Sequence, residues 1–182
     1  MIKYFFKMNF LTNLYKIKQQ NSNTFTKKEP IMTFEELKTK ITEIIAISNR
    51  SREEKLLSIC EVLGDSVAYY NWVGFYFANH ETQTLHLGPY VGAETDHTII
   101  PFGKGICGQV AVSNANFVVP DVTAQDNYIA CSFTVKSEIV VPLFVNGKNI
   151  GQIDIDSHVI DPFTEADERF LEFVNQQVAT LF

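Results

Sequence analysis

Two cysteines stand in segments where packing makes no demand for sulfur. Cys107 lies between glycines in the segment Gly105–Gly108, and Cys131 lies 24 residues later in a polar loop. A cysteine at a helix start meets backbone N–H groups and the positive end of the helix dipole, which favour a thiolate. The two segments flank one short predicted strand and can meet at one sheet edge. If both loops lie at that edge, the geometry permits one thiol to act as nucleophile and the other as resolving thiol.

A set of acids is the second element of candidate chemistry. In the segment 153–156, Ile-Asp-Ile-Asp, strand alternation puts the isoleucines on one face and Asp154 and Asp156 on the other, ~6.5–7 Å apart. Glu138 opens the preceding predicted strand, and a hairpin can bring it beside the same face. Clustered carboxyls repel, so at least one pKa should rise and leave a proton to donate. Ordinary solvation of a strand end is the competing interpretation.

The remaining motifs are assigned to structure. The pattern Gly103-x-Gly105-x-x-Gly108 satisfies the dinucleotide fingerprint, but only eight residues separate Gly108 from the next strand at Phe117. A parallel crossover needs about a dozen residues or more, so these glycines are predicted to let a turn approach the sheet closely. The histidines offer no close-spaced pair of zinc ligands, and no metal is expected. Those histidines are His80, His86, His97 and His158.

Hydrophobic periodicity predicts the elements that position these residues. Thr33 and Ser51 each precede a glutamate by three residues, and these capping boxes open two amphipathic helices. Cys60 lies in the apolar stripe of the second helix and is interpreted as buried. Thr164 caps a last helix. Further elements are predicted at Trp72–Ala78, Thr84–Tyr90, Thr98–Phe102, Phe117–Val119, Glu138–Val145 and Asn149–Asp156 (strands) and at Gln109–Ser113 (a brief helix). Hairpins without crossover helices imply an antiparallel sheet covered by helices, an α+β domain.

Charge divides the chain of 182 residues near Met32. Residues 1–31 carry a net charge of +5 and residues 32–182 carry −11. We expect residues 1–31 to be a disordered extension, or translated sequence upstream of a natural start at Met32; a membrane-surface helix is the alternative. The total of −6 argues against a nucleic-acid partner, and no apolar run approaches the ~18 residues of a membrane span. Three cysteines without an export signal fit a reducing cytoplasm.

Five segments in order resemble the free methionine-(R)-sulfoxide reductases, small enzymes built on a GAF domain. They are NWVGFY from Asn71, PFGKGICG, YIACS, SEIVVPL and GQIDIDS. The resemblance runs from about Met32 to Phe182 and implies a GAF-like fold, with a central antiparallel sheet flanked by helices. It implies that Cys131 is the nucleophile and Cys107 the resolving thiol. It also implies a set of substrate-binding residues, namely Glu138, Asp154, Asp156, Trp72 and Tyr76.

One departure from the family pattern bears on the thiols. Many members carry a further cysteine shortly before the PFGKG segment, whereas Gly92–Ile100 here has none. A relay through a third cysteine is therefore in doubt. Because Cys60 is interpreted as buried, Cys107 is left as the resolving thiol.

The resemblance implies thiol-dependent reduction of free L-methionine-(R)-sulfoxide to L-methionine, through a cysteine sulfenic acid and an intramolecular disulfide. The expected reductant is of the thioredoxin type, no metal or organic cofactor is needed, and a homodimer is compatible with the sequence. The alternative is a GAF module that binds a cyclic nucleotide or another small molecule and signals without catalysis. Such a binder leaves the two thiols and the acids without a role. An interaction protein with a basic arm is a third alternative, resting only on residues 1–31.

Overall fold

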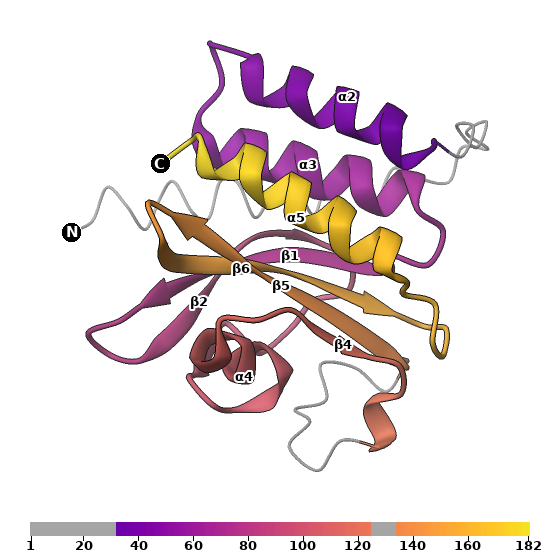
Figure 1. The fold of residues 1–182 in the computed structure, drawn as a ribbon, viewed down its shortest axis with the longest axis vertical. Coiled ribbons are helices and arrows are strands. Elements are labelled where there is room, and N and C mark those ends of the chain that lie inside the picture. The colour runs from indigo at the N-terminus through magenta and orange to yellow at the C-terminus, as the bar shows by residue number, and fades with distance from the viewer. Residues whose placement is uncertain (1–31, 125–133) are drawn as a thin grey trace.

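The computed structural model describes residues 32–124 and 134–182. Its helices are α2 (Phe34–Ala46), α3 (Arg52–Ser66), α4 (Gly105–Ser113) and α5 (Glu165–Ala179), with a short 3₁₀ turn at Val122–Ala124. Its strands are β1 (Trp72–Asn79), β2 (Thr84–Val91), β3 (Ile99–Pro101), β4 (Phe117–Val119), β5 (Ser137–Val145) and β6 (Lys148–Ser157). They form one sheet in the order β3-β2-β1-β6-β5-β4, and the paired strands are antiparallel. The predicted α+β class is confirmed (Figure 1).

The predicted helix starts are confirmed by cap geometry. Capping boxes begin α2 at Thr33, α3 at Ser51 and α5 at Thr164, each with side chain and backbone bonded in both directions. All six predicted strands appear with ends that differ by at most one residue. The prediction for the brief helix was wrong at its start, because α4 begins at Gly105 and not at Gln109. Cys107 therefore lies in the first turn of α4.

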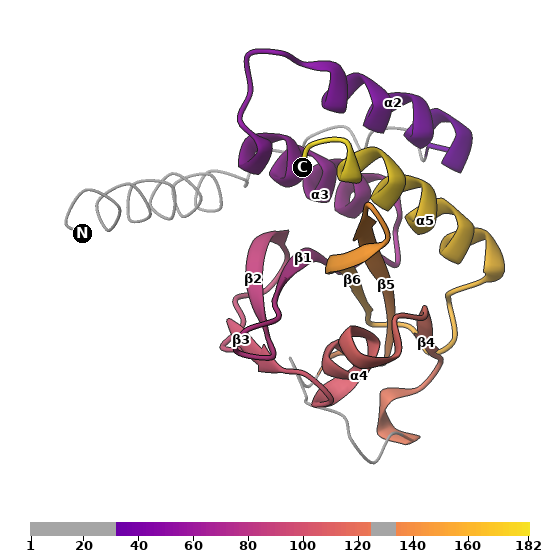
Figure 2. The ribbon, with the colours of Figure 1, turned by 60° about the vertical axis from the view of Figure 1, so that its left-hand side comes forward.

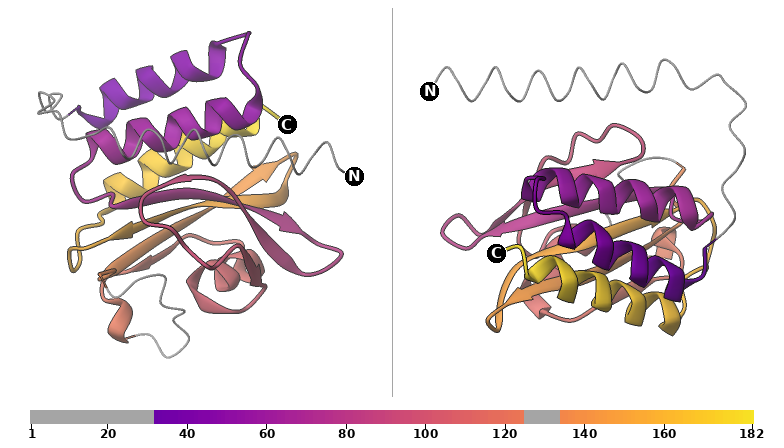
Figure 3. Two further views of the ribbon diagram at one scale, coloured as in Figure 1. Left: turned by 180° about the vertical axis from the view of Figure 1, so that it is seen from behind. Right: turned by 90° about the horizontal axis from the view of Figure 1, so that it is seen from above.

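Helices cover the two faces of the sheet unequally. The helices α2, α3 and α5 pack together over one face, and α4 alone lies on the other (Figures 1 and 3). Figure 2 shows the sheet curling, with β3, α4 and β4 on the side away from the three helices. We call the two sides the three-helix face and the α4 face. Among the described residues, no helix is long and apolar enough to cross a membrane.

Alternate side chains of strand β6 point to opposite faces of the sheet. Ile153 and Ile155 are fully buried in the apolar core of the three-helix face, as the sequence predicts. Cys60 belongs to the same core with no exposed surface, and burial raises the pKa of its thiol. This confirms that Cys60 fills a structural position. Asp154 and Asp156 alternate with the two isoleucines, and their side chains are buried on the α4 face.

The glycine-rich segment at the start of α4 makes the predicted close approach at Gly108 but not at Gly103. A Cβ at Gly108 would lie 2.5 Å from the carbonyl oxygen of Pro101, the last residue of β3. Only a glycine lets α4 pack this closely against that strand. The antiparallel sheet also excludes the parallel crossover that a dinucleotide-binding unit requires.

Candidate active site

Strand register assembles a polar floor on the α4 face. Asp156 of β6 pairs with Trp72 of β1 on one side and with Glu138 of β5 on the other. Asp154, two residues earlier on β6, pairs with Gly74 of β1. The three acids are therefore neighbours on the sheet. Each retains at most 4% of its accessible surface.

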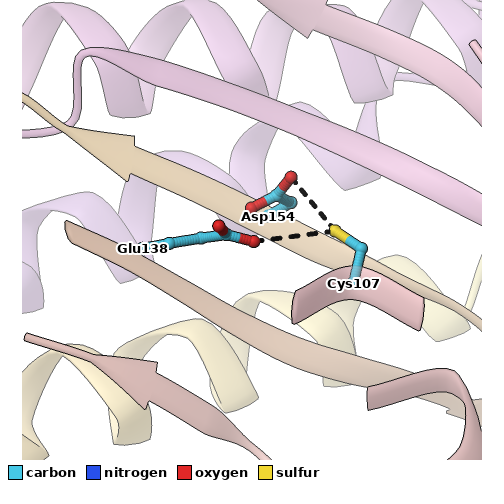
Figure 4. Close-up of side chains that lie close together, drawn as sticks. All are labelled: Cys107, Glu138 and Asp154. Atoms are coloured by element: carbon cyan, nitrogen blue, oxygen red, sulfur yellow. Dashed lines mark hydrogen bonds between the residues drawn. The ribbon is translucent and has the colours of Figure 1, made fainter. Parts of the chain in front are cut away.

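Helix α4 places Cys107 over this floor. The Cys107 thiol donates a hydrogen bond to Asp154 Oδ2 at 3.2 Å, and a longer one to Glu138 Oε1 at 3.9 Å (Figure 4). Cys107 is itself 5% exposed. The structure thus brings together three of the residues singled out in the sequence, one each from α4, β5 and β6.

The neighbours of Cys107 add acceptors that the helix start alone does not predict. A helix start alone favours a thiolate, yet here two carboxyl groups face the sulfur and accept from it. The helix start and the two acceptors therefore act on the same sulfur. The role of Cys107 as the resolving thiol stays a prediction.

The buried acids hold protons more tightly than ordinary carboxyls do. Burial raises the pKa of Glu138 well above its usual value, and repulsion from Asp154 and Asp156 adds to the shift. Burial also raises the pKa of Asp154 to about 7, although the hydrogen bond from Cys107 acts in the opposite direction. Asp156 is shifted upward by burial and by the charge of Asp154. The cluster consequently retains a proton at neutral pH, as the clustering of acids predicts.

Two aromatic side chains flank the acids on β1. Trp72 and Tyr76 lie on one face of the strand, with ring centroids 6.3 Å apart and planes inclined by 28°. The Trp72 indole donates to the carbonyl oxygen of Ala93 at 3.1 Å, and the Tyr76 hydroxyl donates to that of His97 at 2.9 Å. These bonds hold both rings to the segment between β2 and β3. In the strand register, Trp72 is the partner of Asp156.

A glycine that the sequence analysis passed over allows this arrangement. A Cβ at Gly74 would lie 2.3 Å from Cη2 of Trp72. Glycine at this position lets the indole lie along β1 over Gly74, which is the strand partner of Asp154. A glycine between two aromatic residues of a strand signals such a close approach, and that signal was present in the sequence.

Three further polar residues at the site were not identified from the sequence. His97 and Lys104 line a small cavity together with Cys107, Glu138 and Asp154. Neither occurs in a pattern that points to the acids, so no sequence signal singled them out for this role. Gln152 is fully buried, and within the described residues its amide has no hydrogen-bond partner. It extends the row of Asp154 and Asp156 by one step of two residues, and this spacing could have revealed it.

Cys131, the predicted nucleophile, falls in residues 125–133 and so outside the described residues. Its distance from Cys107 stays a prediction. The same holds for the predicted character of residues 1–31. Among the described residues, the donor atoms of Cys107, Glu138 and Asp154 lie within 4.8 Å of one another, a spacing at which they could hold a metal ion.

Comparison with known proteins identifies the fold family. The family model for the GAF domain matches residues 53–182. A structure of free methionine-R-sulfoxide reductase from Neisseria meningitidis, in complex with its substrate, is 35% identical with a TM-score of 0.77. The match covers 82% of this chain and 87% of that one. The chain belongs to the free methionine-R-sulfoxide reductases of the GAF-domain family.

Two further relatives of this reductase family agree. A fRMsr structure of Staphylococcus aureus, in complex with substrate, is 33% identical over 86% of this chain and 99% of that chain, with a TM-score of 0.74. Free methionine-R-sulfoxide reductase of Saccharomyces cerevisiae is 45% identical over 104 residues, which are 56% of this chain and 57% of the yeast protein. The aligned segment thus spans less than two thirds of the length of that curated relative.

Proposed function

We propose that this chain reduces free L-methionine-(R)-sulfoxide to L-methionine. The observation that carries the proposal is the buried contact of the Cys107 thiol with Glu138 and Asp154. Trp72 is close in the sheet, as the strand partner of Asp156. A thiol, a retained proton and an apolar ring are what reduction of a small sulfoxide requires. Membership of the free methionine-R-sulfoxide reductases supports the choice of substrate.

The first chemical step belongs to Cys131. Its thiolate attacks the sulfoxide sulfur, the S–O bond breaks, and the oxygen passes to Cys131 as a sulfenic acid. The substrate sulfur gains two electrons and the cysteine sulfur loses two. Breaking the S–O bond needs a proton on the oxygen, and the raised pKa values of Glu138 and Asp156 make these carboxyls the proton source.

The second step belongs to Cys107. Its thiol condenses with the sulfenic acid of Cys131, releasing water and forming the intramolecular disulfide. An external dithiol of the thioredoxin type then reduces the disulfide, which fits a protein of the reducing cytoplasm. Assembly as a homodimer stays a prediction.

The site also accounts for a free amino acid as the substrate. A carboxylate of the acid cluster can bind the substrate ammonium group, and the Trp72 ring can cover its S-methyl group. Methionine sulfoxide within a polypeptide has an amide where the free amino acid has an ammonium group. Such a substrate should bind weakly, because it leaves a buried carboxylate without its cation.

One assay tests the proposal. The full chain, reduced with dithiothreitol, is given four compounds: the R and S epimers of free methionine sulfoxide and the N-acetylated form of each. We expect methionine from the free R epimer and far slower reaction of the other three. The Glu138→Gln variant keeps the shape of the side chain and should lose at least about 100-fold in rate, the scale of a lost general acid. Equal rates for the free and N-acetylated compounds would rule out the proposed contact with the substrate ammonium group. No turnover at all would favour a GAF module that binds a ligand without catalysis.

A further inference from the structure

The cluster formed by Cys107, Glu138 and Asp154 has the dimensions of a zinc site. The sulfur lies 3.2 Å from Asp154 Oδ2 and 3.9 Å from Glu138 Oε1 (Figure 4). Tetrahedral zinc, with Zn–S of about 2.3 Å and Zn–O of about 2.0–2.2 Å, sets ligand sulfur and oxygen about 3.6 Å apart. The two measured distances bracket that value. The three donors come from α4, β5 and β6, so the fold fixes their spacing.

Unpartnered buried oxygens point independently to a cation. Among the described residues, Oδ1 of Asp154 and Oδ1 of Asp156 have no hydrogen-bond partner, although each side chain is 98% buried. No ion pair within residues 32–124 and 134–182 involves either aspartate or Glu138. Buried polar atoms left without partners are rare, and an unoccupied ion site is one explanation for them.

We propose that the reduced protein binds one zinc ion through the Cys107 sulfur and the carboxylates of Glu138 and Asp154. On binding, Cys107 and any protonated acid release their protons to solvent, and no electrons are transferred. The fourth zinc position faces the cavity that His97 and Lys104 line and is filled by water. Three protein ligands with one open position is a common zinc arrangement.

Zinc at this site inhibits the reaction reversibly, and it binds only while Cys107 is reduced. The inhibition, unlike the binding, rests on the proposed function. Bound zinc occupies the resolving thiol and Glu138, one of the two proposed proton sources, so it slows the first step and blocks the second. When Cys107 is in a disulfide its sulfur is no longer a thiolate ligand, and zinc must leave. Magnesium and calcium do not substitute, because these hard cations select oxygen ligands and need more of them.

A binding titration tests the site without any catalytic readout. The full chain, reduced with a phosphine that leaves zinc free, is titrated with Zn²⁺ against a colorimetric indicator under argon. We expect one zinc per chain and at least 10-fold weaker binding in Cys107→Ser and in Asp154→Asn. The matched control Cys60→Ala removes a thiol from the other face and should bind as the wild type does. Cd²⁺ should give a thiolate charge-transfer band in the wild type and in Cys60→Ala but not in Cys107→Ser.

The disulfide form of the wild-type chain is a second arm that does not depend on a variant folding. It should lose the zinc site and regain it on reduction. Unchanged zinc binding in Cys107→Ser, or in the disulfide form, overturns the proposal. For inhibition, methionine released in one turnover should fall with one equivalent of zinc and recover with a chelator. If zinc binds but the zinc-free protein never yields methionine, the proposed function fails and the metal site stands.

Discussion

The two faces of the sheet bury different kinds of side chain. On the three-helix face, β6 presents Ile153 and Ile155 to a core of aliphatic and aromatic side chains. On the α4 face, the same strand presents Asp154 and Asp156, which are as deeply buried yet leave oxygens unpartnered among the described residues. Neighbouring residues of one strand therefore lie in an apolar environment and in an acidic one. The contrast teaches that the three-helix face is an apolar core, whereas the α4 face combines a second apolar cluster with the acids to which we assign the chemistry.

The two described cysteines show the same contrast. Cys60 packs among apolar side chains of the three-helix face and its thiol meets the carbonyl oxygen of Pro89 at 3.5 Å. Cys107 is nearly as buried, yet carboxyl oxygens of Asp154 and Glu138 face its sulfur. Burial alone therefore does not separate a structural cysteine from one that we propose to be reactive. The polar groups that face the sulfur do.

The largest expected effect comes from moving an acid to the wrong face. Ile155→Asp buries a carboxyl among apolar side chains and leaves a cavity, so we expect a loss on the order of 5 kcal/mol and failure to fold. Urea denaturation followed by circular dichroism measures it. Ile155→Val is the matched control and should cost about 1 kcal/mol. A stable, folded Ile155→Asp variant would contradict the division between the faces.

Asp156→Asn on the α4 face should do the reverse, costing activity and not stability. Burial opposes the ionisation of Asp156, and this opposition costs stability at pH 8, so replacing the carboxyl by an amide should raise the free energy of unfolding by about 1 kcal/mol. Methionine formation should fall at least about 100-fold, since a member of the acid cluster is lost. Denaturation and turnover are measured on the same preparation. Full activity together with lower stability would show that Asp156 is structural.

The free energy of unfolding should depend on pH because of the buried acids on the α4 face. Because the folded-state pKa of Asp154 is raised from 3.8 to about 7, the native state binds this proton more tightly than the unfolded chain does. The stabilising contribution is complete below about pH 4 and is lost as pH rises through about 7, with a slope of at most ~1.4 kcal/mol per pH unit for one group. Urea midpoints between pH 4 and 8, with a chelator present, measure it. Asp154→Asn should flatten the curve, and an unchanged curve would count against the raised pKa.

Cys60→Ser should give the smallest effect. The hydroxyl is less suited to an apolar core than the thiol, so we expect a loss of about 1–2 kcal/mol in stability. Methionine formation per folded enzyme should not change, because Cys60 lies on the three-helix face. Thermal melts and single-turnover assays measure the two quantities. A loss of recycling in Cys60→Ser would mean that this thiol takes part in the chemistry.

The sequence predicted the elements well because each carries a local signal. Thr33, Ser51 and Thr164 mark helix starts by capping, and β6 shows its two faces by alternation. The start of α4 was predicted four residues late because its first turn contains Gly105 and Gly108, which helices usually avoid. Gly108 allows close packing against β3, and Gly105 has a positive φ of 62°. Both are constraints of the folded chain that no local pattern reveals.

The site was predictable in its members and not in its geometry. Glu138, Asp154 and Cys107 could be chosen from residue types and family resemblance. That the thiol would face two carboxyls depends on how α4 crosses β5 and β6, which spacing along the chain does not encode. Gly74 and Gln152 were missed for different reasons: the first acts by lacking a side chain, and the second reads as an ordinary strand residue.

Single-turnover release of methionine from the pre-reduced chain tests the central claim most directly. Free L-methionine-(R)-sulfoxide is added to the wild type, Cys107→Ser and Cys131→Ser without further reductant, and methionine and remaining thiols are counted. We expect one methionine per chain from the wild type with loss of two thiols. Cys107→Ser should also release one methionine but fail to cycle, and Cys131→Ser should release none. Methionine from Cys131→Ser but none from Cys107→Ser would contradict the account, because the thiol that faces the acids would then be the one that attacks.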